Sequence, residues 1–172
     1  MKGIIIYKGK YGATRQYAIW LGNILNIPAV LAGIEMKEQL QAADYIIMGT
    51  SVYIGKLQLR KWMEQHRDLL VSKRLFLFLV AGTPVSEKEK LEEYITVNVS
   101  AEIRSRCSCF FLPGKLEFKK LSLLDKILLK MGARLAKTRG ESIVMTDYNN
   151  VKRDQLSEVV SAVGKLNEVA VK

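Results

Sequence analysis

Short apolar runs alternate with amphipathic segments along the whole chain, and this alternation limits the fold more than any other feature of the sequence. The clearest runs are Gly3 to Tyr7, Tyr45 to Met48, Leu75 to Val80 and Cys107 to Leu112, with a weaker one from Pro28 to Ile34. Buried strands that alternate with helices are typical of βαβ units that wind an open parallel sheet. We therefore expect an α/β domain with five parallel strands.

The segments between these runs have apolar residues at helical spacing. The helix after the first strand has an apolar face made of Thr14, Tyr17, Ala18, Leu21 and Leu25. A further helix follows the third strand from Leu59 to Leu70, and Ser86 with Glu89 has the spacing of a capping box that opens the next one. The last helix is expected from about Asn150.

The composition is that of a globular domain without structural metals or disulfides. The chain has 172 residues, of which 49% are hydrophobic, and a chain of this size buries enough surface for a full core. The longest apolar run, Leu75 to Gly82, has eight residues, whereas a bilayer span needs about 20. Met1 to Lys10 is too short for the apolar region of a secretory signal. We expect a cytoplasmic protein.

The two cysteines, Cys107 and Cys109, lie two positions apart with no second Cys pair or His nearby. This spacing fits neither a zinc site nor a CxxC redox motif. Two residues of one strand also meet the geometry of a disulfide poorly. We expect both to be buried as small apolar side chains.

The segment 113–140 is the compositional outlier. It holds eight basic and two acidic residues, so it contributes +6 to a net charge of +10. Its apolar residues follow a heptad-like stripe made of Leu121, Leu124, Leu128, Met131 and Leu135. The basic residues that lie mostly away from this stripe are Lys126, Lys130, Arg134 and Lys137. The pattern predicts a basic amphipathic helix inserted after the fifth strand.

Two interpretations of this insert stay open. It is either an ordinary charged helix that packs its leucine stripe over the core, or a docking surface for an anionic membrane or a carboxylate-bearing substrate. Nucleic acid is a third polyanion, but no recognition motif accompanies the charge. We therefore expect no specific nucleic-acid binding.

Ligands of an open α/β sheet bind beyond the carboxyl ends of its strands, and three loops in that position are rich in glycine or hydroxyl groups. The candidate site residues are Lys8, Gly9, Lys10, Tyr11, Gly12, Ala13 and Thr14 after the first strand, Thr50, Ser51, Val52, Tyr53, Ile54 and Gly55 after the third, and Ala81, Gly82 and Thr83 after the fourth. Glycines let backbone amides approach a ligand, and a helix that begins near Gly12 directs its positive dipole end toward the first loop. The sequence predicts a phosphate site there, reinforced by Lys8, Lys10 and Arg15.

Several kinds of site are excluded by the residues present. Neither GxxxxGK[ST] nor GxGxxG occurs, so a mononucleotide fits the first loop better than a dinucleotide. A phosphoacceptor receiver domain of the same topology would need acidic residues where the first and third strands end, and this chain has Ile6-Tyr7 and Met48-Gly49 there. We identify no catalytic acid or base and no metal-ligand set, and His66 is expected to be a packing residue on an apolar helix face.

Three parts of the chain carry a family resemblance: Tyr7 to Trp20, the run from Asp44 to Gly55, and the basic insert. Together they resemble the flavodoxin-domain family, most of all the branch that includes the menaquinone-dependent protoporphyrinogen IX dehydrogenases of heme biosynthesis. The resemblance covers nearly the whole chain. It implies a single flavodoxin-like domain over residues 1–172, a three-layer sandwich with strand order 2-1-3-4-5, and FMN as the cofactor.

The resemblance also assigns roles within the three loops. Gly12 and Thr14 match the closing Gly-x-Thr of the family's phosphate loop, which makes the Thr14 hydroxyl and the loop amides phosphate donors. The family's usual loop opens with Ser or Thr, whereas this chain has Lys8-Gly9-Lys10, so lysine charge replaces hydroxyl donors. Tyr53 is the candidate for stacking on the isoalloxazine ring. The third loop lacks an aromatic residue, which leaves one flavin face open to a substrate.

Three functions are compatible with this resemblance. The first is an FMN-dependent oxidoreductase that takes electrons from a carboxylate-bearing tetrapyrrole and passes them to a quinone, with residues 115–139 in peripheral contact with the inner face of the cell membrane. The second is an electron carrier for protein partners, which the charge of +10 disfavours because carriers of this family are typically acidic. The third is a degenerate domain without FMN that binds through its basic insert.

Overall fold

The computed structural model describes residues 1–138 and 146–169, and the chain divides into two compact units. The larger one, the sheet unit, comprises Met1–Gly114 and Val151–Lys172. The smaller one, the insert unit, comprises Lys115–Asn150. It begins two residues after the start of the compositional outlier at 113–140 and extends ten residues beyond its end.

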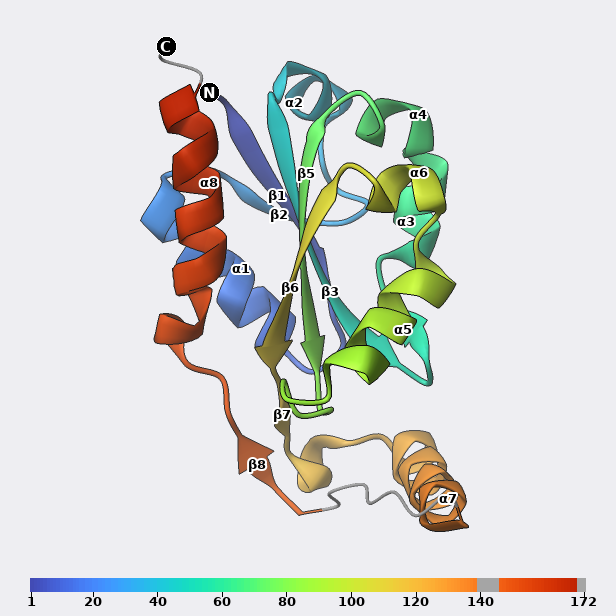
Figure 1. The fold of residues 1–172 in the computed structure, drawn as a ribbon. Coiled ribbons are helices and arrows are strands. Elements are labelled where there is room, and N and C mark those ends of the chain that lie inside the picture. The colour runs from blue at the N-terminus through green and yellow to red at the C-terminus, as the bar shows by residue number, and fades with distance from the viewer. Residues whose placement is uncertain (139–145, 170–172) are drawn as a thin grey trace. The chain divides into compact units, whose positions relative to one another are not determined.

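The sheet unit is built on a parallel sheet with strand order β2-β1-β3-β5-β6 (Figure 1). Its strands are β1 (Gly3–Lys8), β2 (Ala29–Leu31), β3 (Tyr45–Tyr53), β5 (Arg74–Ala81) and β6 (Cys107–Pro113). The two-residue β4 (Lys56–Leu57) pairs antiparallel with the end of β3 and forms a hairpin arm. Because β4 adds no parallel strand, the predicted five-stranded sheet and its order 2-1-3-4-5 are confirmed.

Helices cover both faces of this sheet and make the three-layer sandwich (Figure 1). One face carries α1 (Ala13–Leu25) and α8 (Ser157–Val169), which follows the 3₁₀ turn η2 (Arg153–Leu156). The other face carries α2 (Lys37–Ala42), α3 (Arg60–Gln65), α4 (Arg67–Leu70), α5 (Lys88–Asn98) and α6 (Ala101–Arg104). Each sheet face has its own hydrophobic cluster.

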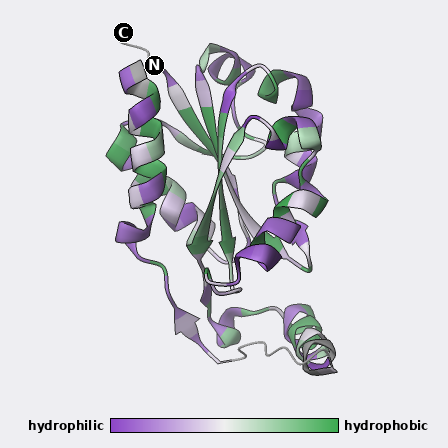
Figure 2. Ribbon diagram, viewed as in Figure 1, coloured by the Kyte–Doolittle hydropathy of each residue, from purple (hydrophilic) through white to green (hydrophobic). Residues whose placement is uncertain are grey.

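The alternation of side chains along the strands explains the two clusters. Ile4 and Leu77 belong to the cluster under α2–α6, whereas their neighbours Ile5 and Phe78 belong to the cluster under α1 and α8. Successive strand residues point to opposite faces, so a central strand covered on both sides must be apolar at nearly every position. Figure 2 shows these hydrophobic residues along the central strands.

The third strand is longer than its apolar run predicts. Beyond Met48 the ladder continues through Gly49, Thr50 and Ser51, which pair with Phe78, Leu79 and Val80. The predicted loop from Gly49 to Gly55 is therefore wrong for most of its length. Position 49 of this strand is a glycine because the Phe78 ring occupies the space where a side chain would lie.

Other boundaries also differ from the sequence pattern. The predicted capping box at Ser86 and Glu89 is absent, since α5 begins at Lys88 after Glu87 without a side-chain cap. The second strand is only three residues long, because the chain turns at Gly33, where φ is 97°. The helix expected over 59–70 divides at His66 into α3 and α4. The last α-helix begins at Ser157 and not near Asn150, and α2 has no counterpart in the prediction.

The insert unit contains the predicted helix, α7 (Leu123–Thr138), together with the 3₁₀ turn η1 (Phe118–Lys120). Two short strands, β7 (Lys115–Leu116) and β8 (Tyr148–Asn149), pair antiparallel at its base. The Phe118 amide donates a 2.7 Å hydrogen bond to the Asp147 carboxylate. Among the described residues, no helix is long and apolar enough to cross a membrane.

Within the insert unit, the leucine stripe does not form one buried face. Leu121 is buried and Leu128 is half-buried, but Leu124 and Met131 are exposed. The reason is that the buried side of α7 is centred on Asp125, which is only 5% exposed. The side chains of Leu135 and Lys137, and residues 139–140, lie outside what the structure describes.

Candidate functional site

The register of the sheet brings the ends of three strands together. Lys8 of β1 pairs with Thr50 of β3, and Thr50 pairs with Leu79 of β5. The loop 9–12, the hairpin after β3 and the loop 82–87 therefore leave the sheet at the same edge. This is the carboxyl edge, where open α/β sheets bind their ligands.

The first loop leads into α1 through a left-handed glycine. Gly12 has φ 82° and is the N-cap residue of the 13-residue α1, with no side-chain cap and no acidic residue in the first turn. The first amides of an α-helix lack intrahelical acceptors and carry the positive end of its dipole. Lys8, Lys10 and Arg15, which lie close to this helix start in the sequence, are exposed. These features suit an anion such as phosphate.

Gly9 departs from the usual hydroxyl-rich loop for a steric reason. A Cβ at this position would lie 2.6 Å from the Thr14 Cβ and 3.4 Å from the Ser51 Oγ. The buried Thr14 side chain thus packs directly under Gly9, and the first loop lies close to the second. A larger residue at position 9 would push the loop away from the first turn of α1.

Lys10 joins the first loop to the hairpin. Its Nζ lies 3.8 Å from the centroid of the Tyr53 ring and 5.6 Å from that of Tyr11. A lysine over an aromatic face is held by the quadrupole of the ring. The structure therefore brings together two sequence-predicted site residues from different loops.

The hairpin has a strained tip. Ile54 and Gly55 have φ of 51° and 69°, the left-handed pair of a two-residue type I′ turn. A β-branched residue at positive φ is a backbone outlier of the kind found at ligand sites. Ile54 is also 62% exposed, so burial does not compensate for this strain.

Two buried polar side chains fix the hairpin from below. The Asn98 amide group of α5 donates to the carbonyls of Gly55 and Tyr94, both at 2.9 Å, and its Oδ1 accepts from the Leu57 amide at 3.2 Å. The Thr50 hydroxyl is fully buried and accepts from the Leu59 amide at 3.1 Å. Sequence analysis missed Asn98, whose only signal is an amide residue among the apolar positions of a helix.

The third loop is short and lies at the same edge. Ala81 is buried, and its carbonyl accepts from the Gly114 amide at 2.9 Å. Gly82 is exposed and Thr83 partly so. All three predicted loops thus lie at this edge of the sheet. Of these loops, the first has Tyr11, the second has Tyr53 and the third has no aromatic residue.

A groove borders the hairpin. It has a volume of about 530 Å³ and is lined by Tyr53, Ile54, Lys56, Leu57, Gln58, Arg60, Lys61 and Glu64. Three of these residues are basic and one is acidic, and the tip of the hairpin supplies apolar surface. The groove can therefore accommodate an anionic ligand with an apolar body.

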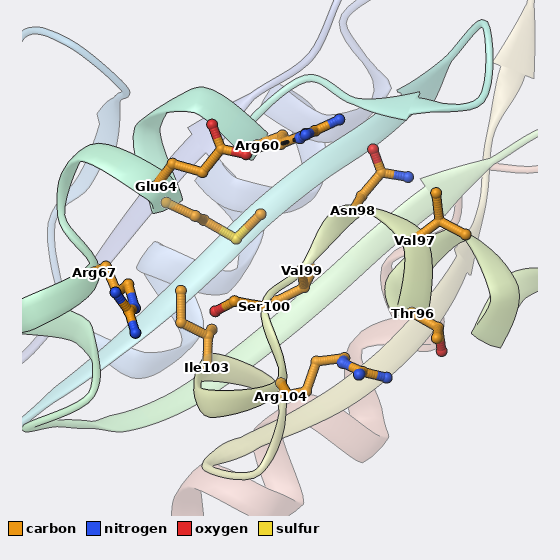
Figure 3. A pocket seen from close by; sticks show the side chains of 12 residues that line it. Arg60, Glu64, Arg67, Thr96, Val97, Asn98, Val99, Ser100, Ile103 and Arg104 are labelled. Carbon is orange, nitrogen blue, oxygen red and sulfur yellow. Dashed lines mark hydrogen bonds and ion pairs between the residues drawn. The ribbon is translucent and has the colours of Figure 1, made fainter.

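A second cavity, of about 410 Å³, shares Arg60 and Glu64 with this groove (Figure 3). Two of its three arginines are engaged with carboxylates. Arg60 donates to Glu64 at 2.8 Å, and Arg67 forms a bidentate pair with Glu102. We assign it no ligand.

The other candidate groups do not form a metal centre. Within residues 1–138 and 146–169, no three His, Cys, Asp or Glu side chains are placed to hold a metal ion. Cys107 and Cys109 are free thiols, half-buried and packed against the cluster under α2–α6. His66 stacks on Trp62 with ring centroids 4.5 Å apart.

A family model of the flavodoxin domain matches residues 4–143. This chain belongs to that family. Membership supports a flavodoxin-like redox protein that binds flavin, in agreement with the phosphate-suited first loop. No curated protein matches the chain.

Three solved structures of bacterial and archaeal proteins are similar to this chain. Smu.1420 from Streptococcus mutans UA159 is 10% identical, with a TM-score of 0.50 over 77% of this chain and 96% of that one. An archaeal flavodoxin is 26% identical over 55% of this chain and 75% of that one, with a TM-score of 0.39. A flavodoxin from Streptococcus pneumonia TIGR4 is 12% identical over 62% and 92%, with a TM-score of 0.37.

Proposed function

We propose that this flavodoxin-domain protein is an FMN-dependent oxidoreductase whose first loop holds the phosphate of the cofactor. The observation that carries this proposal is the start of α1, where the left-handed Gly12 leaves the helix without a side-chain cap and three residues next to it in the sequence, Lys8, Lys10 and Arg15, are exposed cations. A phosphate satisfies both the open amides and the positive dipole end. The residues present therefore fit the cofactor that the family binds.

Each loop has a part in holding FMN. The amides of residues 9–14 and the Thr14 hydroxyl would hold the phosphate, with Lys8 and Lys10 adding charge. Residues 51–55 and 82–83 would flank the isoalloxazine, since Thr50 and Ala81 are buried, and Tyr53 would stack on it. FMN supplies the transfer of electrons or hydride, and the protein supplies binding, orientation and electrostatics. No side chain at this edge is needed as an acid or base.

The groove beside Tyr53 and Ile54 supports a substrate of a particular class. Its lysines, Lys56 and Lys61, suit carboxylates, and its apolar surface suits a flat hydrophobic body. We propose a carboxylate-bearing tetrapyrrole as the electron donor and a quinone as the acceptor, as in the protoporphyrinogen IX dehydrogenases of heme biosynthesis that the sequence resembles. The donor is oxidised and the quinone is reduced to the quinol.

The second candidate is an electron carrier for protein partners. It would use the same cofactor site, but its partners would have to meet a chain of net charge +10. Such a charge favours anionic small molecules or surfaces over the basic partners of acidic carriers. A domain that has lost FMN is the third candidate.

Anaerobic turnover with protoporphyrinogen IX and a soluble menaquinone analogue tests the oxidoreductase proposal. The FMN-loaded protein is expected to oxidise the donor, and Lys56→Gln with Lys61→Gln is expected to raise KM by roughly three- to tenfold, because an exposed ion pair contributes up to about 1 kcal/mol. Lys88→Gln with Lys165→Gln removes the same charge elsewhere and should leave KM unchanged. FMN-loaded protein that exchanges electrons with redox proteins but not with these small molecules would identify a carrier instead.

A further inference from the structure

Helix α7 exposes large apolar side chains to solvent. Four of the exposed large hydrophobic residues of the described chain lie on this helix: Leu123 at 80%, Leu124 at 63%, Ile127 at 56% and Met131 at 54%. At about 100° per residue they fall within one arc of the helix surface. Soluble proteins rarely leave such a contiguous apolar patch uncovered unless it binds something.

Basic side chains run beside this apolar arc. Lys126, Lys130 and Arg134 follow one another at intervals of four, so they form a row along α7, and Lys130 and Arg134 are exposed. Lys119 and Lys120 precede the helix in η1 and are exposed as well. The one acidic residue of α7 is Asp125, which is buried. The exposed side of the helix thus combines apolar and cationic groups, a mixture also visible along α7 in Figure 2.

The possible binding partners of this surface differ in whether they would contact its apolar residues, its cations or both. Nucleic acid would use the cations but leave the apolar arc in water. A second copy of the chain would cover the apolar arc but bring two rows of cations together. An anionic bilayer satisfies both, because apolar side chains enter the acyl boundary while lysine and arginine remain among the headgroups.

We propose that one face of α7, formed by the exposed Leu123, Leu124, Ile127, Met131, Lys130 and Arg134 with the half-buried Lys126, is a docking surface for an anionic phospholipid bilayer. The helix has 16 residues, fewer than the roughly 20 needed to cross a bilayer, so it lies along the surface. This docking does not depend on the proposed FMN site, and its test involves neither flavin nor turnover.

Vesicle flotation with the full-length protein tests the proposal. Vesicles of phosphatidylcholine with roughly one-third phosphatidylglycerol should bind the protein at least about tenfold more tightly than phosphatidylcholine alone, since each basic residue near an anionic surface contributes roughly 1 kcal/mol. Binding should weaken as salt is raised. Equal binding to both vesicles, or binding to neither, overturns the proposal.

Two sets of variants separate the apolar from the cationic part. Leu124→Ser with Ile127→Ser should lower binding about tenfold or more, because the apolar burial is lost, and Lys130→Gln with Arg134→Gln should do the same through charge. Ile34→Ser with Val97→Ser removes exposed apolar residues of the sheet unit, and Lys37→Gln with Lys165→Gln removes exposed lysines. Loss of binding in these controls to the same extent contradicts a surface on α7.

A third variant keeps the test valid if the serine variants do not fold. Ile127→Trp places a fluorophore on the apolar arc without removing apolar surface. Its emission should shift to shorter wavelength on addition of phosphatidylglycerol vesicles, whereas Val97→Trp should not respond. An unshifted emission overturns the proposal. Concentration-dependent dimerisation or binding of duplex DNA, in a protein that does not bind the vesicles, overturns it as well.

Discussion

The hairpin beside the proposed flavin site depends on Asn98, a side chain 41 residues away from its partner Leu57 in the sequence. Asn98 makes three hydrogen bonds in a buried position, two of them to the turn and to β4. The strained Ile54-Gly55 tip is therefore held in place by a residue that never reaches the loop surface.

Replacement of Asn98 by alanine should lower both stability and flavin affinity. The amide of Leu57 and the carbonyl of Gly55 would lose their buried partner, which costs about 1–3 kcal/mol. Urea unfolding should report this loss, and FMN titration should report a weaker complex because the hairpin is no longer fixed. Thr96→Ala, an exposed position of the same helix, is the control. Unchanged FMN affinity in a destabilised Asn98→Ala protein would show that hairpin geometry does not matter for binding.

Glu35 is a second polar centre at the residue scale, and the residue as a whole is half-buried. Its side chain is 6% exposed and accepts 2.6 Å hydrogen bonds from the Trp62 indole and the Gly33 amide. Burial alone would raise the pKa of Glu35, but these hydrogen bonds, with the nearby His66, hold it below its usual value of 4.5. Hydrogen bonding to the charged form thus outweighs desolvation.

This lowered pKa predicts a pH-dependent stability. A carboxylate with a depressed pKa in the folded state stabilises the protein above its unfolded value and loses that contribution as pH falls through the folded value. The free energy of unfolding should therefore exceed that of Glu35→Gln by about 1–3 kcal/mol at pH 7, and the difference should shrink below pH 4.5. Urea titrations of both proteins across pH 3–7 would measure it, and a constant difference would contradict the assignment.

Elements differ in how well the sequence predicts them. The buried strands and the basic helix follow from periodicity, because a strand covered on two faces or a long amphipathic helix leaves a strong pattern. The end of β3 does not, since Gly49, Thr50 and Ser51 have the composition of a loop. What makes them a strand is tertiary: the ladder to β5 and the Phe78 ring over Gly49.

Gly49 gives this conclusion a direct test. A Cβ there would lie 2.8 Å from two atoms of the Phe78 ring, so Gly49→Ala should destabilise the protein by about 1–3 kcal/mol through overpacking. Phe78→Leu in the same chain should recover part of that loss by giving the methyl group room. Thermal unfolding of both single variants and the double variant measures the coupling. Strictly additive effects would mean that the ring does not limit position 49.

Some features of the candidate site can also be predicted from the sequence pattern, whereas others depend on contacts that only the fold creates. Convergence of the three loops follows from topology, and the glycine-rich first loop could be found from its residues alone. The contact of Lys10 with Tyr53 and the support from Asn98 could not, because they join segments that only the fold brings together. The exposed arc of α7 was likewise hidden, since heptad spacing does not reveal which side of a helix is buried.

At the scale of the whole molecule, most of the excess positive charge and the proposed flavin site lie in different parts of the chain. Residues 113–140 contribute +6 to a total of +10, and the proposed flavin site belongs to the sheet unit. A lipid-soluble quinone and an anionic bilayer would both be accessible to a protein that binds flavin with one unit and the membrane with the other. The proposed oxidoreductase and the docking surface are thus compatible without depending on each other.

The central claim is that the first loop binds the phosphate of FMN, and flavin absorption of the protein dialysed after addition of FMN or riboflavin tests it most directly. We expect a retained band with FMN, affinity at least about tenfold greater than for riboflavin because charge-assisted phosphate contacts are lost in the latter, and a selective loss of FMN affinity in Thr14→Ala. A colourless protein after dialysis, or equal affinities for the two flavins, would contradict the account.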